Sequence, residues 1–287
     1  MIRRKCLSFD RVLLFIILIC LIALSGYRQA FALSSGENFR YEYGVFLGVD
    51  AGKKAMRRFR NYKTIVLDVQ SDFTKEDIDK LKANGHTVYS YINVGAVENY
   101  RDYYNKYLDI TLEEYENWPD ERWVDVSSKR WQDFILKDLS VRIINTGVDG
   151  FFVDNVDVYY QYHTKEIYDG TEVILKGLKE NGKVIINGGD TFVMEYLSNG
   201  GNPGEILDGI NQESVFSCIL DYNRNRFGEN DADSREYYLN YTETIRKNNK
   251  DVYLLEYTRK RKLKNKIREF CDSHGYHYYV SRKLDLK

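Results

Sequence analysis

Eight short apolar segments recur along the chain and alternate with segments that carry helical signals, and this alternation constrains the fold more than any other feature. The apolar segments are residues 43–48, 64–69, 87–95, 151–153, 184–187, 209–213, 252–257 and 276–281. Thr74 is an expected N-cap of one helix between them, and another helix is expected to run from about Thr164 to Lys179. Strands that alternate with helices predict a parallel sheet with right-handed crossovers. The count of eight predicts an α/β fold, a (β/α)8 TIM barrel in a single domain.

The first 32 residues have the pattern of a secretory signal peptide. Basic residues between Arg3 and Arg11 precede an apolar run at 12–24, and Ala30 and Ala32 offer a small-residue cleavage site. The apolar run is shorter than the roughly 20 residues that span a bilayer. We therefore expect a secreted protein with a signal peptide at 1–32, a polar linker at 33–41 and the barrel at 42–287. A leader that stays uncut would instead anchor the barrel at the cell surface.

Charge and motif content exclude several classes of partner. Without the leader, which carries five basic residues and one acidic residue, the chain has 37 Lys and Arg against 42 Asp and Glu, a net charge of −5. This balance disfavours nucleic acid and is compatible with a cationic substrate. Glycine-rich phosphate-binding motifs are absent from the sequence, and its four histidines are scattered, so we predict neither a cofactor nor a metal.

Polar side chains stand at the carboxyl ends of six predicted strands. They are Asp68, Asn93, Asp154, Asn187, Glu213 and Glu256. In a TIM barrel the carboxyl ends of all strands meet at one mouth, where catalytic residues are found. We expect all six side chains at this mouth.

The stretch 147–157 carries the sharpest of these signals. The apolar run 151–153 follows Gly150 and ends in Asp154 and, three residues later, Asp157. A buried strand that delivers an acid at its carboxyl end indicates a catalytic carboxylate, although both acids could instead cap the next helix. Asp157 could also raise the pKa of a neighbouring acid by repulsion, and the sequence leaves its role open.

Glu213 is a candidate partner for Asp154. The predicted fourth and sixth strands are second neighbours, about 9–10 Å apart, so two inward acids at their ends could approach each other. Such a pair hydrolyses glycosides: one carboxylate attacks or stabilises the anomeric carbon while the other donates a proton to the leaving oxygen. The predicted separation permits the close spacing of a retaining enzyme and does not exclude the wider inverting one.

Five segments together resemble the endo-α-1,4-polygalactosaminidases of glycoside hydrolase family 114. They are Tyr89 to Glu98 with Tyr100-Arg101, Trp123 to Ser127, Gly147 to Asp157, Asn211 to Ser214, and Tyr279 to Arg282. The resemblance implies a TIM barrel that acts on galactosamine polymers, with an Asp after the fourth strand and a Glu after the sixth as catalytic pair. By motif these roles fall on Asp154 and Glu213.

The leading hypothesis is therefore an exported glycoside hydrolase that cleaves an amino-sugar-rich polysaccharide. The residues expected to bind this substrate are Asp68, Tyr91, Asn93, Glu98, Asp157 and Asn187. The alternative is a non-catalytic carbohydrate-binding barrel at the cell surface. The sequence gives no signal for an oligomeric state.

Overall fold

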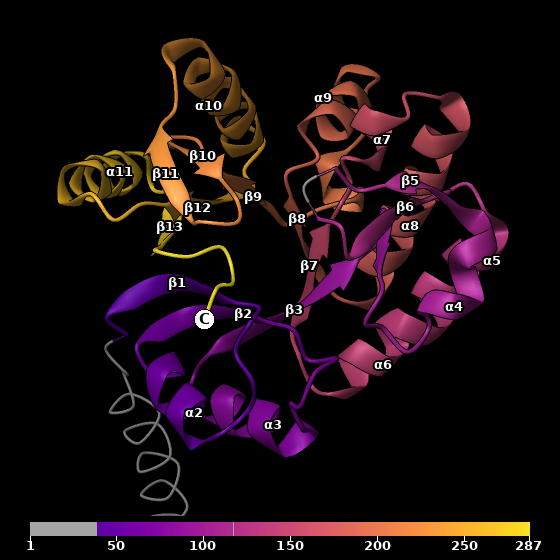
Figure 1. Ribbon diagram of the computed structural model, residues 1–287, viewed down its shortest axis with the longest axis horizontal. Coiled ribbons are helices and arrows are strands. Elements are labelled where there is room, and N and C mark those ends of the chain that lie inside the picture. Colours follow the sequence, from indigo (N-terminus) through magenta and orange to yellow (C-terminus); the bar gives the residue numbers. More distant parts are fainter. Residues whose placement is uncertain (1–38, 117) are drawn as a thin grey trace, which may run out of the picture. The chain divides into compact units, whose positions relative to one another are not determined.

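Eight parallel strands pair in chain order in the computed structural model of the protein. They are β1 (Tyr41–Phe46), β2 (Tyr62–Leu67), β3 (Thr87–Asn93), β7 (Gly150–Asp154), β8 (Lys183–Asn187), β9 (Gly209–Glu213), β12 (Asp251–Tyr257) and β13 (His277–Ser281). The end strands β1 and β13 lie beside each other, so the sheet is nearly closed (Figure 1). The predicted (β/α)8 barrel is confirmed, and each predicted strand is present within two residues at either end.

The structure describes residues 39–116 and 118–287, which belong to the unit Phe39–Lys287. The predicted signal peptide at 1–32 lies outside the described residues. Of the helices in the described ranges, none has the length and apolar character needed to cross a membrane.

Helical segments connect the strands and cover the outside of the barrel (Figure 1). They are α2 (Lys53–Phe59), α3 (Lys75–Ala83), α4 (Tyr104–Tyr107), α5 (Lys129–Phe134), α6 (Ser140–Asn145), α7 (Val158–Gln161), α8 (Lys165–Asn181), α9 (Asp190–Ser198), α10 (Ala232–Lys247) and α11 (Arg261–His274), with a π-helical turn η2 (Ile135–Leu139) and 3-10 turns η1 (Leu108–Ile110) and η3 (Pro203–Glu205). Thr74 caps α3 as predicted, and Thr164 caps α8, because each side chain accepts a hydrogen bond from a backbone N–H in the first turn.

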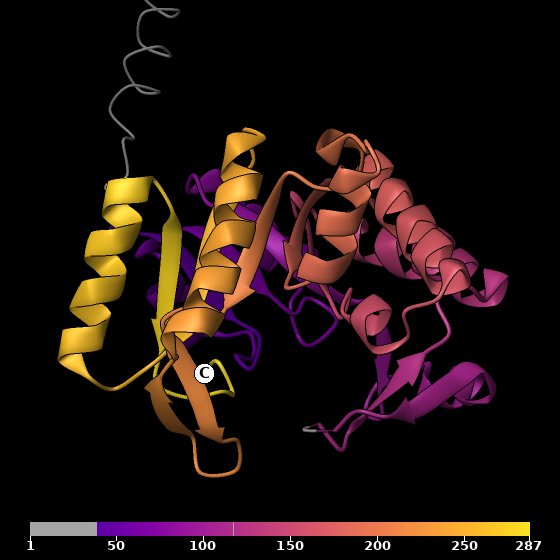
Figure 2. The ribbon, with the colours of Figure 1, turned by 90° about the horizontal axis from the view of Figure 1, so that it is seen from above.

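Two antiparallel sheets replace segments that the sequence predicted as loops. The excursion after β3 contains β4 (Ala96–Glu98), β5 (Thr111–Glu114) and β6 (Glu121–Val124), and the loop after β9 contains the hairpin of β10 (Ser217–Asp221) and β11 (Arg226–Glu229). These strands have three to five residues each and carry polar residues, so they lack the apolar run that marked the barrel strands. The β10–β11 hairpin and the β5–β6 ribbon extend from the barrel on the same side (Figure 2).

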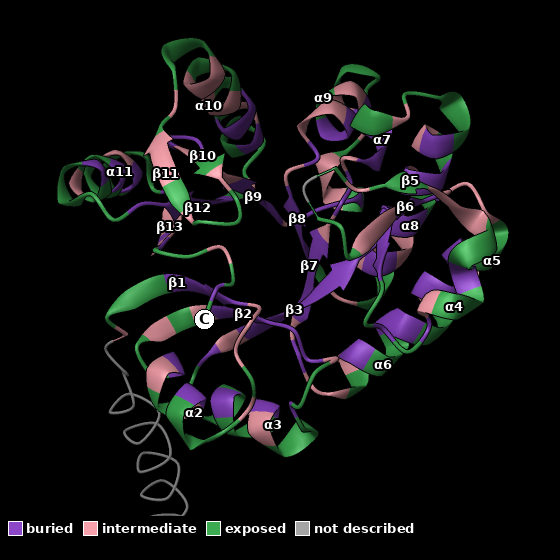
Figure 3. Cartoon of the chain, in the orientation of Figure 1, coloured by how far each residue is buried: buried purple, intermediate pink, exposed green. Residues whose placement is uncertain are grey.

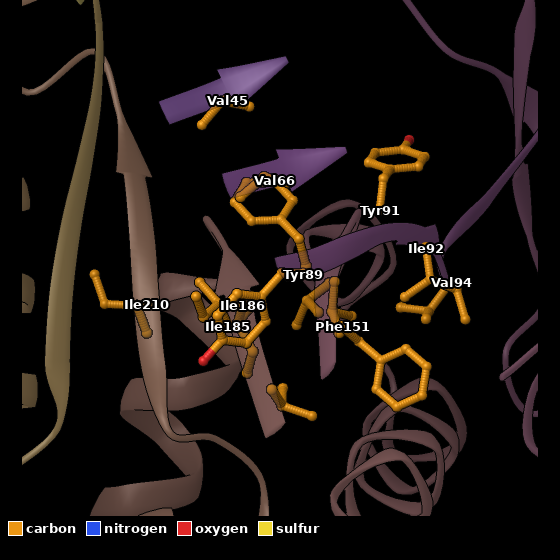
Figure 4. Packing of buried hydrophobic residues seen from close by; sticks show 14 of the residues in the cluster. Val45, Val66, Tyr89, Tyr91, Ile92, Val94, Phe151, Ile185, Ile186 and Ile210 are labelled. Carbon is orange, nitrogen blue, oxygen red and sulfur yellow. The ribbon is translucent and has the colours of Figure 1, made fainter. Parts of the chain in front are cut away.

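Both faces of the central barrel strands β3 and β7 are buried (Figure 3). In β7 the side chains of Phe151, Phe152 and Val153 are at most 1% exposed, although they alternate between the barrel interior and the helix layer. Branched and aromatic side chains from successive strands pack together, as Figure 4 shows for Val45, Val66 and neighbours on β3, β7, β8 and β9. This packing gives the strand ends a rigid base.

Candidate active site

A cavity of about 570 Å³ opens at the carboxyl ends of the barrel strands. The two accessory sheets contribute to its lining: Trp118 lies in the connection between β5 and β6, and Tyr222 lies in the turn of the β10–β11 hairpin. The two rings meet edge to face with their centroids 6.0 Å apart. The cavity thus has barrel strand ends as its base and partly exposed aromatic rings in its walls.

Asp154 and Glu213 line this cavity and share one hydrogen-bond donor. The Asn187 side-chain nitrogen donates to Asp154 Oδ1 and to Glu213 Oε1, at 2.9 Å in each case. Because both bonds start from one atom, the two carboxylate oxygens can be no more than 5.8 Å apart, which is twice the bond length. The predicted approach of the two acids is present in the structure.

The orientation of Asn187 is fixed by a chain of buried hydrogen bonds. Its carbonyl oxygen accepts a 2.6 Å bond from the Asn211 amide, and the Asn211 carbonyl accepts a 3.0 Å bond from the Tyr43 hydroxyl. Tyr43 and Asn211 are both fully buried. Because the side-chain carbonyl of Asn187 is held by Asn211, the side-chain N–H₂ group of Asn187 points toward the two acids.

Asp154 receives two more donors besides Asn187. The Asn155 backbone N–H and the Tyr91 hydroxyl also face its carboxylate and favour the ionised form. Asn155 has a left-handed backbone with φ 61°, which asparagine tolerates better than most residues. Burial raises the pKa of Asp154, and the three donors oppose that rise because they favour the ionised form.

Glu213 has a different balance of interactions. Its Oε2 accepts a 2.7 Å hydrogen bond from the Tyr257 hydroxyl, in addition to the Asn187 bond on Oε1. Burial raises the pKa of Glu213, the two hydrogen bonds lower it, and the charge of Asp154 raises it again. In both acids burial is therefore the largest cause that raises the pKa, and hydrogen bonds oppose it.

Asp157 does not cap α7 through its side chain. Its two carboxylate oxygens lie 3.2 and 3.3 Å from the Gly189 N–H, which bonds to them. Burial and the charge of Asp190 raise its pKa to about 7. Gly188 has φ +66°, and a Cβ there would stand 2.7 Å from Asp157, so this approach requires glycine. The charge of Asp154 adds to this rise, and the predicted effect of Asp157 on the pKa of a neighbouring acid stays a prediction.

The residues predicted to bind substrate separate into two groups. Asp68, Tyr91, Asp157 and Asn187 line the cavity, whereas Asn93 and Glu98 lie behind its lining. Asn93 bonds through its carbonyl to the Ala96 N–H at 2.8 Å. Their roles in binding stay predictions.

A buried ion-pair group explains the positions of Asp68 and Glu98. Arg101 Nη1 lies 2.9 Å from Asp68 Oδ2, and Arg101 Nη2 lies 3.0 Å from Glu98 Oε1. The side chain of Arg101 is 6% exposed, that of Asp68 is 10% exposed and that of Glu98 is 0% exposed. The guanidinium also lies over the rings of Tyr91 and Tyr100. This group therefore supports one wall of the cavity.

The expectation that Glu256 faces the mouth is wrong. Its carboxylate is fully buried and accepts hydrogen bonds from the Phe216 and Ser217 N–H groups and from the Ser217 hydroxyl. Successive side chains on a strand point to opposite faces, so Glu256 turns to the helix side while Tyr257 reaches the cavity. Glu256 fixes the chain between β9 and β10.

Sequence reasoning missed Glu121 and Tyr257, which both line the cavity. Tyr257 directly follows Glu256 at the end of β12, so attention to alternation along that strand could have identified it. Glu121 lies in β6, which pairs with β4 and β5. This strand has only four residues, so its sequence shows no clear periodic pattern. In the part of the chain that the structure describes, no group of three or more His, Cys, Asp or Glu side chains is arranged to hold a metal ion.

A nearly closed (β/α)8 barrel with two bridged carboxylates at its carboxyl mouth is an arrangement of the glycoside-hydrolase class. The model of glycoside-hydrolase family GH114 matches residues 25–286, and the chain belongs to this family. The family resemblance of the five sequence segments is thereby confirmed.

Solved structures with this fold include the glycoside hydrolase domain of PelA from Pseudomonas aeruginosa. It superposes with a TM-score of 0.69 at 18% identity, over 85% of this chain and 95% of that domain. The galactosamine complex of Aspergillus fumigatus Ega3 gives a TM-score of 0.66 at 16% identity, over 87% and 93% of the two chains. At these identities the likeness establishes the fold.

Two curated relatives match over shorter regions. An uncharacterized protein of Deinococcus radiodurans is 31% identical over 88 residues, which are 29% of this chain and 28% of the relative. The uncharacterized protein MJ1477 of Methanocaldococcus jannaschii is 30% identical over 120 residues, 38% and 34% of the two chains. The matches therefore span about a third of each relative or less.

Proposed function

We propose that the protein is an exported glycoside hydrolase that cleaves galactosamine-rich polysaccharide with retention of anomeric configuration. The observation that carries the proposal is the single Asn187 nitrogen that bonds to both Asp154 and Glu213. Retaining enzymes hold their two carboxyl groups about 5–5.5 Å apart, and inverting enzymes hold them about 6.5–9.5 Å apart. With the bridged oxygens at most 5.8 Å apart, the two carboxyl groups can meet the retaining spacing, and the configuration of the first product separates the two reactions.

In the proposed mechanism the Asp154 carboxylate attacks the anomeric carbon while the bond to the leaving sugar oxygen breaks. Protonated Glu213 gives its proton to that oxygen, and a glycosyl ester forms on Asp154. Glu213, now ionised, takes a proton from a water whose oxygen attacks the anomeric carbon. This second step releases the sugar and restores both acids.

The charge of the cavity supports a cationic substrate. Seven acidic residues occur in its lining: Asp68, Glu121, Asp154, Asp157, Asp190, Glu213 and Asp285. Arg101 is the one basic residue in that described lining, and its charge is already engaged by Asp68 and Glu98. Deacetylated galactosamine carries an ammonium group, and Ega3 has been crystallised with galactosamine. The leader pattern at 1–32 supports export to the place where such a polymer would be met.

The test of this proposal is incubation of the protein without residues 1–32 with partly deacetylated α-1,4-galactosamine polymer. We expect new reducing ends, and an initial product whose anomeric proton signal in NMR has the α configuration of the substrate. The β configuration would contradict the retaining mechanism. Binding of the polymer without cleavage would instead favour the carbohydrate-binding alternative.

Replacing Tyr257 with phenylalanine should move the alkaline limb of the pH profile of kcat/KM to higher pH. The Tyr257 hydroxyl favours the ionised form of Glu213, so its loss raises the pKa of Glu213. Glu213 must be protonated in the first step, and a higher pKa keeps it protonated further into the alkaline range. Rates measured between pH 4 and 9 check the shift. Tyr238→Phe, which changes another tyrosine of the cavity, is the control, and a shift to lower pH in Tyr257→Phe would refute the assignment.

A further inference from the structure

Glu121 is an acid of the cavity that the proposed mechanism does not use. It lies at the start of β6 in the accessory sheet and lines the cavity together with Asp154. Its Oε2 accepts hydrogen bonds from the Asn93 and Asn155 amides, both at 3.2 Å. Asn155 follows Asp154 in the chain, so this bond holds Glu121 close to the proposed nucleophile.

The second oxygen of Glu121 differs from the first. Among the residues that the structure describes, no hydrogen bond or salt bridge to Glu121 Oε1 occurs. Burial is the largest cause that raises the pKa of Glu121, to about 8, and the charges of Glu98 and Asp154 add to the rise. The ionised form of a carboxylate that is buried beside other acids is destabilised until a cation binds to it.

The other non-catalytic acids of the cavity already have partners. Asp68 pairs with Arg101, and both oxygens of Asp157 face the Gly189 N–H. Asp190 accepts a hydrogen bond from the Tyr237 hydroxyl and Asp285 accepts one from the Lys287 N–H, each through one oxygen in an exposed contact, whereas the bonds that hold Glu121 are partly buried. Glu121 therefore combines a fixed position, a neighbouring catalytic carboxylate and an oxygen that is open to a further donor.

We propose that Glu121 Oε1 binds the ammonium group of a galactosamine unit next to the bond that is cut, and thereby selects deacetylated over N-acetylated units. This inference rests on the proposed function, because it concerns the same cavity. An ammonium group supplies both the charge and the N–H donors that Glu121 lacks. An N-acetyl group carries no charge and places a bulkier group at the same point.

The test compares Glu121→Gln with the wild type on two substrates, a deacetylated galactosamine oligomer and its fully N-acetylated counterpart. The glutamine side-chain oxygen can still accept the bonds from Asn93 and Asn155, and its N–H₂ group then takes the place of Oε1, so the change removes the negative charge and the acceptor that would meet the ammonium group. We expect the ratio of kcat/KM for the deacetylated over the acetylated substrate to fall about 10- to 100-fold, mostly through KM for the deacetylated one. An unchanged ratio would overturn the assignment.

Two further variants keep the result interpretable. Glu121→Asp retains the charge and should retain the preference for the deacetylated oligomer. Glu114→Gln changes an exposed acid on the neighbouring strand β5 and should leave both substrates unaffected.

Calorimetric binding separates this inference from the proposed function. If the wild type cleaves neither oligomer, the proposed hydrolase function fails, and binding still decides the role of Glu121. Weaker binding of the deacetylated oligomer by Glu121→Gln than by the wild type supports the ammonium site, and equal affinity refutes it.

Discussion

Glu213→Gln should lower kcat on galactosamine polymer by about 10²- to 10⁴-fold, with little change in KM, because general acid catalysis contributes that much to the rate. The glutamine keeps the size of the side chain: its oxygen can accept the bond from Asn187, and its N–H₂ group can donate to the Tyr257 hydroxyl, which then acts as acceptor. It cannot give a proton to the leaving sugar. Steady-state kinetics on a galactosamine oligomer of defined length measures the loss.

A substrate with a good leaving group separates the two catalytic roles. An aryl glycoside of an acidic phenol needs no proton in the first step, so Glu213→Gln should form the glycosyl ester on Asp154 at nearly the wild-type rate and release a burst of phenol. Asp154→Asn cannot form that ester and should be inactive on polymer and aryl glycoside alike. A burst of phenol from Asp154→Asn, or no burst from Glu213→Gln, would contradict the roles of Asp154 as nucleophile and Glu213 as acid. Thermal unfolding of both variants controls for misfolding.

The sequence predicted the barrel because each of its strands is a local signal. In β7 the glycine, the short apolar run and Asp154 follow one another, and burial on both faces of a parallel strand requires this composition. Alternation along a strand then placed Asp154 and Glu213 on the inward side. Their approach across β8, with Asn187 between them, follows from chain order once the strands pair in sequence.

The parts that the sequence did not predict depend on contacts between distant segments. Glu121 reaches Asn93 and Asn155 because β6 pairs antiparallel with β4, and strands of three and four residues are too short to carry a periodic pattern. The partner of Asp157 is the Gly189 N–H, which lies 32 residues further along the chain. Glu98 and Asp68 have the residue types of a sugar-binding site, and only the structure shows that Arg101 holds both.

Arg101→Met should lower the free energy of unfolding by about 3–5 kcal/mol, the usual cost of removing one partner of a buried ion pair. Methionine fills much of the volume of arginine but leaves Asp68 and Glu98 buried without a cation. Asp68 retains a bond from the Gln70 N–H and Glu98 a weak one, 3.5 Å long, from the Tyr100 hydroxyl, and neither replaces a charge. Urea denaturation at pH 7 measures the change.

A neutral variant tests whether the unpaired charges cause this loss. Asp68→Asn and Glu98→Gln, added to Arg101→Met, remove both carboxylates, so the triple variant should recover much of the lost stability. The pH dependence gives a second test. In the wild type burial raises the pKa of Asp68 and the charge of Arg101 opposes that rise, so without Arg101 the folded pKa of Asp68 lies further above the unfolded value, and stability is lost as the pH rises through the folded pKa. The difference between Arg101→Met and the wild type should therefore be larger at pH 8 than at pH 4. A difference that is the same at both pH values would indicate that the loss comes from packing around Tyr91 and Tyr100 rather than from charge.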